Sequence, residues 1–181
     1  SLVKDRVSTV DCLKELKAHF QKEHQQYKKL EAVLADKELA NLAEVQAKLL
    51  GARMLNDAMS GQKIPMFTIF FLQGAWLEFL REIVVHYGEE SKEFSNAGKL
   101  TKAFIWSLQD QDDKAKQQKI MNTLPKNIIE FSQKLKFDTS TIEMSVGDIQ
   151  EEYDQINKGN PSEPCEFDLI ELGENTDDKG L

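Results

Sequence analysis

The sequence contains only two cysteines, Cys12 and Cys165, which lie far apart in the chain. This number and spacing exclude a disulfide-stapled fold and the C-x-x-C motifs of zinc and redox sites. The N-terminal residues also lack the long apolar run of a signal peptide. We therefore expect a protein of the reducing cytoplasm. Because the chain begins with Ser1 rather than methionine, we also expect a segment of a longer protein.

Motifs that carry catalysis or hold a metal are also missing. The sequence has no Gly-rich phosphate loop, no G-x-S-x-G and no H-E-x-x-H. The E-x-x-H pattern of ferritin-like di-iron sites is absent too. His19 and His24 lie about 140° apart around a helix and cannot bind one metal ion from one face. We expect no catalytic residue, no metal site and no cofactor.

Helix-breaking residues are scarce. The 181 residues include nine glycines and four prolines, whereas leucine, lysine, glutamate, alanine and glutamine are abundant. These are good helix formers, so the composition favours helix throughout the chain. A chain of this length can bury a large core as a single domain. The predicted fold is all-α, an antiparallel bundle of six or seven helices around a central apolar helix.

The net charge of −8 is unevenly distributed. Residues 138–181 contain thirteen acidic and two basic residues, whereas residues 1–137 contain eighteen acidic and twenty-one basic residues. A negative protein is a poor ligand for a nucleic-acid backbone, so we expect no nucleic-acid partner. We predict a helical bundle domain over residues 1–159. Residues 160–181 form either an irregular acidic tail or the start of a truncated further domain.

The segment 64–88 is the most apolar part of the chain and predicts the central helix. It has no charged residue from Ile64 to Leu77, and it contains four of the ten phenylalanines. Its apolar residues recur at three- and four-residue spacing around most of the helix circumference. The uncharged run is 14 residues, shorter than the roughly 20 that a membrane span needs. We therefore expect a buried core helix and no membrane partner.

Apolar spacing predicts the other helices. Residues 8–33 form an exposed amphipathic helix, with Cys12 half-buried and inert, and Asp36 caps a second helix that ends at Ser60. Ser91 caps a helix that carries Trp106 at a helix–helix edge, and Asp112 or Asp113 caps the next one. Pro125 predicts a break after Thr123 and a fresh helix from residue 125. A last helix ends at Gly159.

Six lysines and one acidic residue occur between residues 114 and 136. One interpretation places the acidic tail or the last helix beside this basic region, and the other leaves both surfaces solvated. The lysines that define this candidate basic face are Lys114, Lys116, Lys119, Lys126, Lys134 and Lys136.

A short strand-like run follows at residues 165–172, and a lone strand has no sheet to join.

Several local patterns resemble the bacterial domain of unknown function family 1631. They are Pro65 before an apolar helix, Phe71-Leu72 followed by Trp76, the turn Gly88-Glu89-Glu90-Ser91, the pair Trp106-Ser107, and Leu124-Pro125. The resemblance covers roughly residues 52–156 and contains no catalytic motif. Phe94 departs from it, because tryptophan is commoner there. Some members continue into a region similar to the PilZ cyclic-di-GMP-binding domain, whose Arg-rich ligand motif is absent from this sequence.

These observations favour a non-enzymatic cytoplasmic helical module of a larger bacterial protein that binds a protein partner, and they leave both a monomer and a homo-oligomer open. Phe67, Phe71 and Trp106 are the candidate contact residues. Two alternatives stay open. One is a component of cyclic-di-GMP-type signalling with its ligand site outside this segment. The other is an enzyme with an unrecognised site between helices.

Overall fold

The protein is described here by a computed structural model that covers residues 2–173, with the side chains of residue 6 and residues 8–173. The chain divides into two units, Ser1–Ala43 and Glu44–Leu181. It is 78% helical. The prediction of an all-α fold is therefore confirmed. The described residues form five helices rather than six or seven, because two predicted interruptions are absent.

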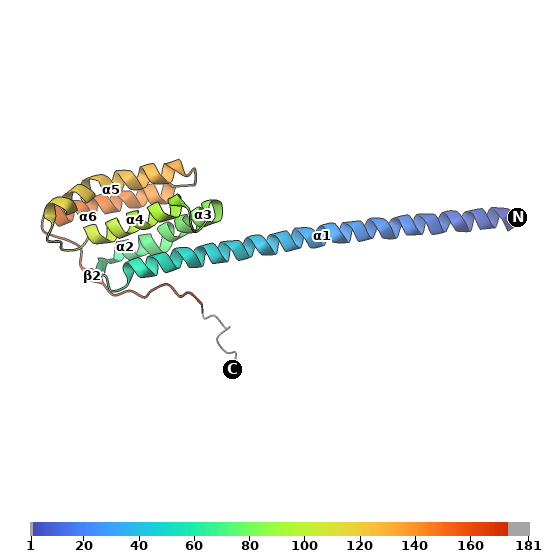
Figure 1. Cartoon of the computed structure of the whole chain (residues 1–181), viewed down its shortest axis with the longest axis horizontal. Helices are drawn as coiled ribbons and strands as arrows, with labels where there is room; N and C mark the ends of the chain where they lie inside the picture. Colours follow the sequence, from blue (N-terminus) through green and yellow to red (C-terminus); the bar gives the residue numbers. More distant parts are fainter. Residues whose placement is uncertain (1, 174–181) are drawn as a thin grey trace, which may run out of the picture. The chain divides into compact units, whose positions relative to one another are not determined.

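Helix α1 runs without a break from Leu2 to Met59 (Figure 1). The predicted interruption before Asp36 is wrong. Residues 2–50 contain no glycine or proline, so nothing in the backbone disfavours helix there, and Asp36 lies within the helix rather than capping it. The first unit consists of the N-terminal part of this helix. Within the second unit, α1 ends at Met59 and is followed by a turn at Ser60 and Gly61, in which Gly61 has a φ of +72°.

The segment predicted as the central helix contains β1 (Ile64–Pro65), α2 (Met66–Phe71), η1 (Leu72–Trp76) and α3 (Leu77–Tyr87). The last three form one continuous helix, and η1 is a π-helical turn in which the Leu77 N–H donates to the Leu72 carbonyl. Leu72, Trp76, Leu80 and Ile83 are at most 1% exposed. The segment is therefore buried, as its apolar pattern predicts.

Three further helices cover this segment. They are α4 (Lys92–Ser107), α5 (Lys114–Lys134) and α6 (Ser140–Asn157), and α5 contacts both α4 and α6. Two predicted N-caps are confirmed, because Ser91 Oγ accepts from Phe94 N–H at 3.1 Å and Asp113 Oδ1 accepts from Lys116 N–H at 2.9 Å. Gly88 ends α3 with a φ of +92°, which favours glycine.

Pro125 does not break α5, so the predicted break after Thr123 is wrong. An interior proline costs about 3 kcal/mol, because it removes one backbone hydrogen bond and crowds the preceding turn. Here Pro125 is buried together with Leu124 and Ile128, on the face that packs into the core. Burying these side chains offsets the cost, since each buried aliphatic side chain contributes about 1.5–3 kcal/mol.

Aromatic side chains form the centre of the core. The centre of the Trp76 ring lies 5.7 Å from the centre of the Phe71 ring and 5.3 Å from that of the Phe79 ring. Phe104 of α4 packs edge-on against Phe71, with 5.9 Å between the two ring centres. Trp76 Nε1–H donates to Thr101 Oγ1 at 2.8 Å, and the Thr101 hydroxyl donates to the Ala97 carbonyl at 2.7 Å. The only polar atom of Trp76 is therefore satisfied inside the core.

The residues after α6 lie against the bundle. β2 (Pro164–Cys165) pairs antiparallel with β1, which corrects the expectation of a strand without a partner. Phe167, Ile170 and Leu172 pack on the core as partly buried residues. Together with β2, these contacts fix residues 164–172 on the bundle.

Replacing Thr101 by valine preserves the shape of the side chain but leaves the Trp76 N–H without an acceptor in the core. We expect Thr101→Val to lower the free energy of unfolding by about 1–3 kcal/mol. Urea unfolding followed by tryptophan fluorescence measures this change. Thr123→Val, at an exposed position of α5, is the matched control and should stay within about 0.5 kcal/mol of wild type. Equal effects of both substitutions would contradict the assigned role of Thr101.

Candidate interaction surface

The first unit exposes a row of large apolar side chains on α1. We define the α1 stripe as Leu13, Leu16, Phe20, Tyr27, Leu30 and Leu34, which follow one another at intervals of three, four, seven, three and four residues. Their exposed fractions lie between 46% and 63%. This spacing places all six on one side of the helix. A further five apolar residues of α1 are similarly exposed, namely Val10, Val33, Leu39, Leu42 and Val45.

A shallow groove lies along the N-terminal part of the stripe. It encloses about 480 Å³ and is lined by Leu13, Leu16 and Phe20, with Lys17, Gln21 and His24 at its margins. On the neighbouring surface, His19 Nε2 lies 3.2 Å from Glu23 Oε1. The groove is thus an apolar hollow with polar margins, which is the chemistry that receives an apolar side chain of another helix.

Cys12, next to the stripe, is exposed. The prediction that it is half-buried is wrong, because α1 has no buried side chain before Ala47 among those that the structure describes. Cys165 is half-buried, and both cysteines are free.

The three contact residues predicted from the sequence lie in different surroundings. Phe71 is 6% exposed and has almost no surface to offer, whereas Phe67 is half-buried. Trp106 is half-buried between α4 and α5, with Lys116 Nζ 5.0 Å from its ring centre. Met66 and Phe70, which are not among the predicted contact residues, are 57% and 71% exposed and lie one helical turn apart on α2.

All six lysines of the candidate basic face are exposed. Lys114 Nζ lies 2.6 Å from Asp110 Oδ1, and Lys126 Nζ lies 3.7 Å from Glu130 Oε1. Helix α6 is a neighbour of α5, but no ion pair joins these lysines to residues 138–173. The described part of the tail is held elsewhere, by β1, Asn56 and Gln73.

A charged cluster surrounds Arg81 on α3. Its Nε donates to Glu78 at 3.0 Å and its Nη2 donates to Glu82 at 2.8 Å, while Nη1 lies 3.9 Å from Glu44. Lys48 also reaches Glu78, at 3.4 Å. A pocket of about 520 Å³ lies beside this cluster and is closed on its other side by Phe137 and Ile142. Its lining carries three carboxylates, Glu78, Glu82 and Asp138, and the single guanidinium of Arg81, so the pocket is net negative and has no unpaired guanidinium for an anion.

Partial burial acts to raise the pKa of the Glu78 carboxyl, but hydrogen bonding and charge from Arg81, together with Lys48, outweigh it. The net result is a lowered pKa. Because the folded state lowers the pKa of Glu78, its carboxylate stabilises the fold at pH values above the ordinary pKa of a carboxyl. This stability is lost as the pH falls through the pKa that Glu78 has in the folded state.

Tyr153 and Glu152 are the buried titratable residues of α6. Burial raises the pKa of the Tyr153 phenol, although its 2.6 Å hydrogen bond with Ser107 Oγ acts in the opposite direction. Gln117 donates to the carbonyls of Ser107 and Gln109 beside it. Glu152 accepts from the backbone N–H and from the hydroxyl of Ser162. These polar groups satisfy one another within the protein.

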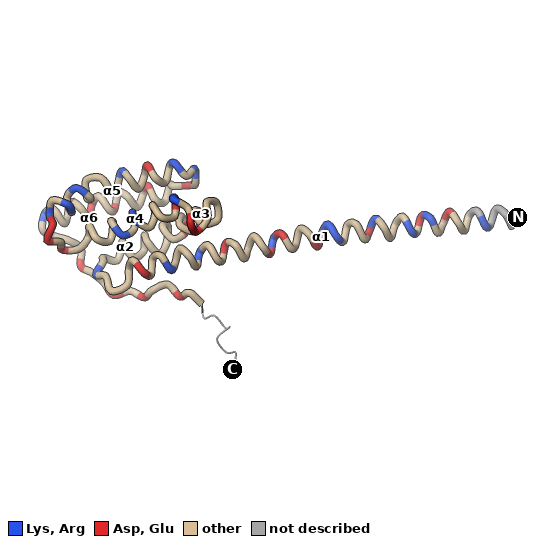
Figure 2. The backbone as a smooth tube through the Cα atoms, viewed as in Figure 1, with Lys and Arg blue, Asp and Glu red and all other residues tan. Residues whose placement is uncertain are grey.

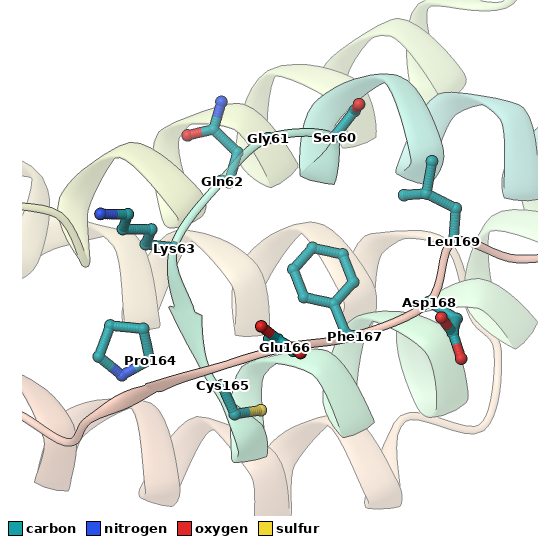
Figure 3. Close-up of a pocket in the computed structure, with 10 residues that line it drawn as sticks. All are labelled: Ser60, Gly61, Gln62, Lys63, Pro164, Cys165, Glu166, Phe167, Asp168 and Leu169. Carbon is teal, nitrogen blue, oxygen red and sulfur yellow. The ribbon is translucent and has the colours of Figure 1, made fainter.

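A groove of the second unit lies between the α1–β1 turn and the tail (Figure 3). It encloses about 770 Å³ and is lined by residues 60–63 and 164–169. One side is held in place by Asn56, whose side chain donates to the Ile170 carbonyl and accepts from the Ile170 N–H, both at 2.8 Å. Lys63 is its one cation, opposite Glu166 and Asp168, so the lining carries no net positive charge.

Among the described residues, no group of three or more histidine, cysteine, aspartate or glutamate side chains is arranged to hold a metal ion. None of the described helices combines the length and the hydropathy needed to cross a bilayer.

The order of features in the second unit, from the end of α1 through the buried Trp76 helix to Pro125, can be compared with known families. Residues 33–136 match the third domain of the protein of unknown function family DUF1631. The chain belongs to the DUF1631 family. The match begins earlier and ends earlier than the resemblance found in the sequence, and it lends no support to a PilZ-like continuation. Neither the curated proteins nor the solved structures compared with the chain give a match.

This DUF1631 domain contains most of the bundle but only the C-terminal end of the α1 stripe, since the match starts at residue 33. Leu34 is the one stripe residue inside the matched range. The family description names no activity.

Replacing Asn56 by alanine removes both hydrogen bonds to Ile170. We expect the amide of Ile170 to exchange with solvent at least roughly tenfold faster, because two bonds to a partly buried backbone are lost. Hydrogen exchange measured by mass spectrometry over residues 164–172 tests this. Asp57→Ala, at the exposed neighbouring position, should leave the exchange unchanged.

Glu78→Gln removes the carboxylate that Arg81 and Lys48 bind. We expect a loss of stability below about 1 kcal/mol at pH 7, because the partners are partly exposed to solvent. The difference from wild type should shrink as the pH falls below the ordinary carboxyl range, where the wild-type group also becomes neutral. Urea unfolding at pH 7 and pH 3 measures it, with Glu151→Gln, an exposed carboxyl of α6 without an ion pair, as the control. A difference that grows at low pH would contradict the lowered pKa of Glu78.

Proposed function

We propose that the chain is a non-enzymatic helical interaction module of a larger cytoplasmic bacterial protein, and that it binds a helix of a protein partner through the α1 stripe. The observation that carries the proposal is the exposure of the six large apolar side chains of the α1 stripe on one side of one helix, each between 46% and 63% exposed. Soluble proteins rarely leave contiguous apolar surface of this extent in water unless it is a binding site.

The geometry of the stripe supports a helical partner. Apolar anchors at three- and four-residue spacing are what a second helix presents when it packs along the first. The groove beside Leu16 and Phe20 offers a place for one apolar side chain of that helix. Polar residues at its margins supply contacts that fix the alignment. Phe67 and Trp106 are proposed as additional contact residues on the bundle.

The polar clusters of the second unit support a structural role rather than a catalytic one. The Arg81 guanidinium is engaged by three carboxylates, and the Tyr153 phenol is bonded to Ser107 in the core. Catalysis would need a nucleophile and a base that both face a cavity. The free, exposed thiol of Cys12 is consistent with a reducing cytoplasm.

Site-specific photo-crosslinking in cells tests the proposal. A photoreactive phenylalanine analogue at position 20 or 30 should give a discrete crosslinked product, because these positions lie within the stripe. The same analogue at Gln25 or Ala32, exposed positions more than about 100° away around the helix, should give much less. Equal crosslinking from the two faces, or none from either, would contradict an interface at the stripe.

A further inference from the structure

We propose that the partner of the α1 stripe is the same stripe of a second copy of this chain, and that the two helices pair in antiparallel orientation. The inference rests on the proposed function, because it names the occupant of that surface. Three observations carry it: the seven-residue repeat of the stripe, the two charged residues that interrupt the repeat, and the distribution of charge along the helix.

The spacing of the stripe is that of a two-stranded coiled coil. Leu13, Phe20, Tyr27 and Leu34 lie at exact seven-residue intervals, and Leu16 and Leu30 occupy the second apolar position of the repeat. This pattern keeps an apolar seam facing a partner helix that supercoils with it. Residues 13–37 span about 36 Å of helix, which is long enough for several layers of such packing.

Two members of the repeat are charged, and they select the orientation. Glu23 and Lys37 occupy the second apolar position in the heptads that begin at Phe20 and Leu34. In a parallel dimer each would face its own copy across the seam, so that like charges would be buried together. In an antiparallel dimer each faces a different residue, and this repulsion is absent.

An antiparallel pair that crosses near residue 25 aligns the apolar residues well. Phe20 then lies opposite Leu30 of the second copy, and Leu16 lies opposite Leu34 of the second copy. Glu23 meets the Tyr27 phenol, which can donate a hydrogen bond to the carboxylate. Lys37 meets Leu13, where its aliphatic stem can pack while its ammonium reaches water.

Charge along α1 also favours the antiparallel orientation. Residues 8–29 contain five lysines and three acidic residues, whereas residues 30–45 contain one lysine and four acidic residues (Figure 2). Antiparallel pairing places the basic half of one helix beside the acidic half of the other. A row of residues at seven-residue intervals beside the seam follows the same trend from basic to acidic along the helix. It consists of Lys17, His24, Glu31 and Glu38. Lys17 then faces Glu31 of the second copy.

The pairing would also stabilise the helix itself. Helical propensity alone gives only marginal stability in water, and most of the stability of a helix in a protein comes from packing of its apolar face. The described side chains of the first unit are all exposed. A second copy supplies the apolar burial that this part of α1 lacks within its own chain.

Sedimentation equilibrium of the 181-residue chain tests whether the second copy is the partner. We expect a dimer, and we expect Phe20→Glu and Leu30→Glu each to weaken dimerisation at least roughly tenfold, since each buries charge twice in a symmetric seam. Ala32→Glu adds the same charge on the opposite face and should remain dimeric. Unchanged tryptophan fluorescence in all three variants, from Trp76 and Trp106 of the bundle, confirms that the bundle is intact. A wild-type chain that stays monomeric at about 100 μM would overturn the proposal.

A charge exchange tests the alignment. Lys17→Glu and Glu31→Lys should each weaken the dimer roughly fivefold, because each creates two like-charged pairs in the symmetric dimer. The double variant should recover the wild-type affinity. The two residues lie about 21 Å apart within one helix, so recovery has to come from pairing between copies. A double variant weaker than either single variant would overturn this alignment.

Crosslinking with a short bismaleimide separates the two orientations. In a Cys12→Ser, Cys165→Ser background, Gln26→Cys should give covalent dimers, because residue 26 lies near the two-fold axis of the antiparallel pair. Leu13→Cys should not, since its two copies would be about 36 Å apart. Dimers from Leu13→Cys would overturn the antiparallel orientation.

The two proposals fail in distinguishable ways. A monomeric chain whose stripe photo-crosslinks to a different protein would refute pairing with a second copy and leave the interaction module standing. A chain that neither dimerises nor crosslinks from the stripe would refute both.

Discussion

Removal of the aromatic segment 64–88 from water is the contribution on which the rest of the bundle depends. Leu72, Trp76, Leu80 and Ile83 have almost no exposed surface, and each buried side chain of this size contributes about 1.5–3 kcal/mol. Helices α4, α5 and α6 cover this segment, and the last turns of α1 pack so closely that a Cβ on Gly51 would lie 3.2 Å from Leu80 Cβ. The buried Trp76 indole needs Thr101 as an acceptor, which fixes how α4 lies against the central helix.

Much of this arrangement could be predicted from the sequence. The helical content, the buried segment and the caps at Ser91 and Asp113 follow from local patterns that no long-range contact opposes. The interruptions expected at Asp36 and Pro125 do not occur. A capping residue does not by itself end a helix when its neighbours are good helix formers. Pro125 is tolerated because packing of its face into the core outweighs one lost hydrogen bond.

The candidate surface was harder to predict. The sequence predicts an amphipathic first helix, but an apolar stripe normally packs against the rest of its own fold, and only the structure shows that these side chains are exposed. Phe71 was assigned to the surface and is buried, whereas Phe70 beside it is exposed. The bond between Asn56 and Ile170 joins residues 114 positions apart, and no local pattern encodes such a pair.

The π turn at residues 72–76 has a consequence for how this segment can change in evolution. Gly74 lies within that turn, and a side chain there would meet nothing within 4 Å. Many residue types therefore fit at that position. Loss of one residue from this turn is tolerated as well, because a π turn closes its hydrogen bond over five residues where an α-helix uses four, so removing one residue restores regular α-helix and leaves the orientation of α3 relative to α2 nearly unchanged. Leu80 and Ile83 would keep facing the core, whereas loss of one residue within the regular α-helix of α3 would rotate the residues after it by about 100°, so the turn at residues 72–76 is where the length of this segment can change.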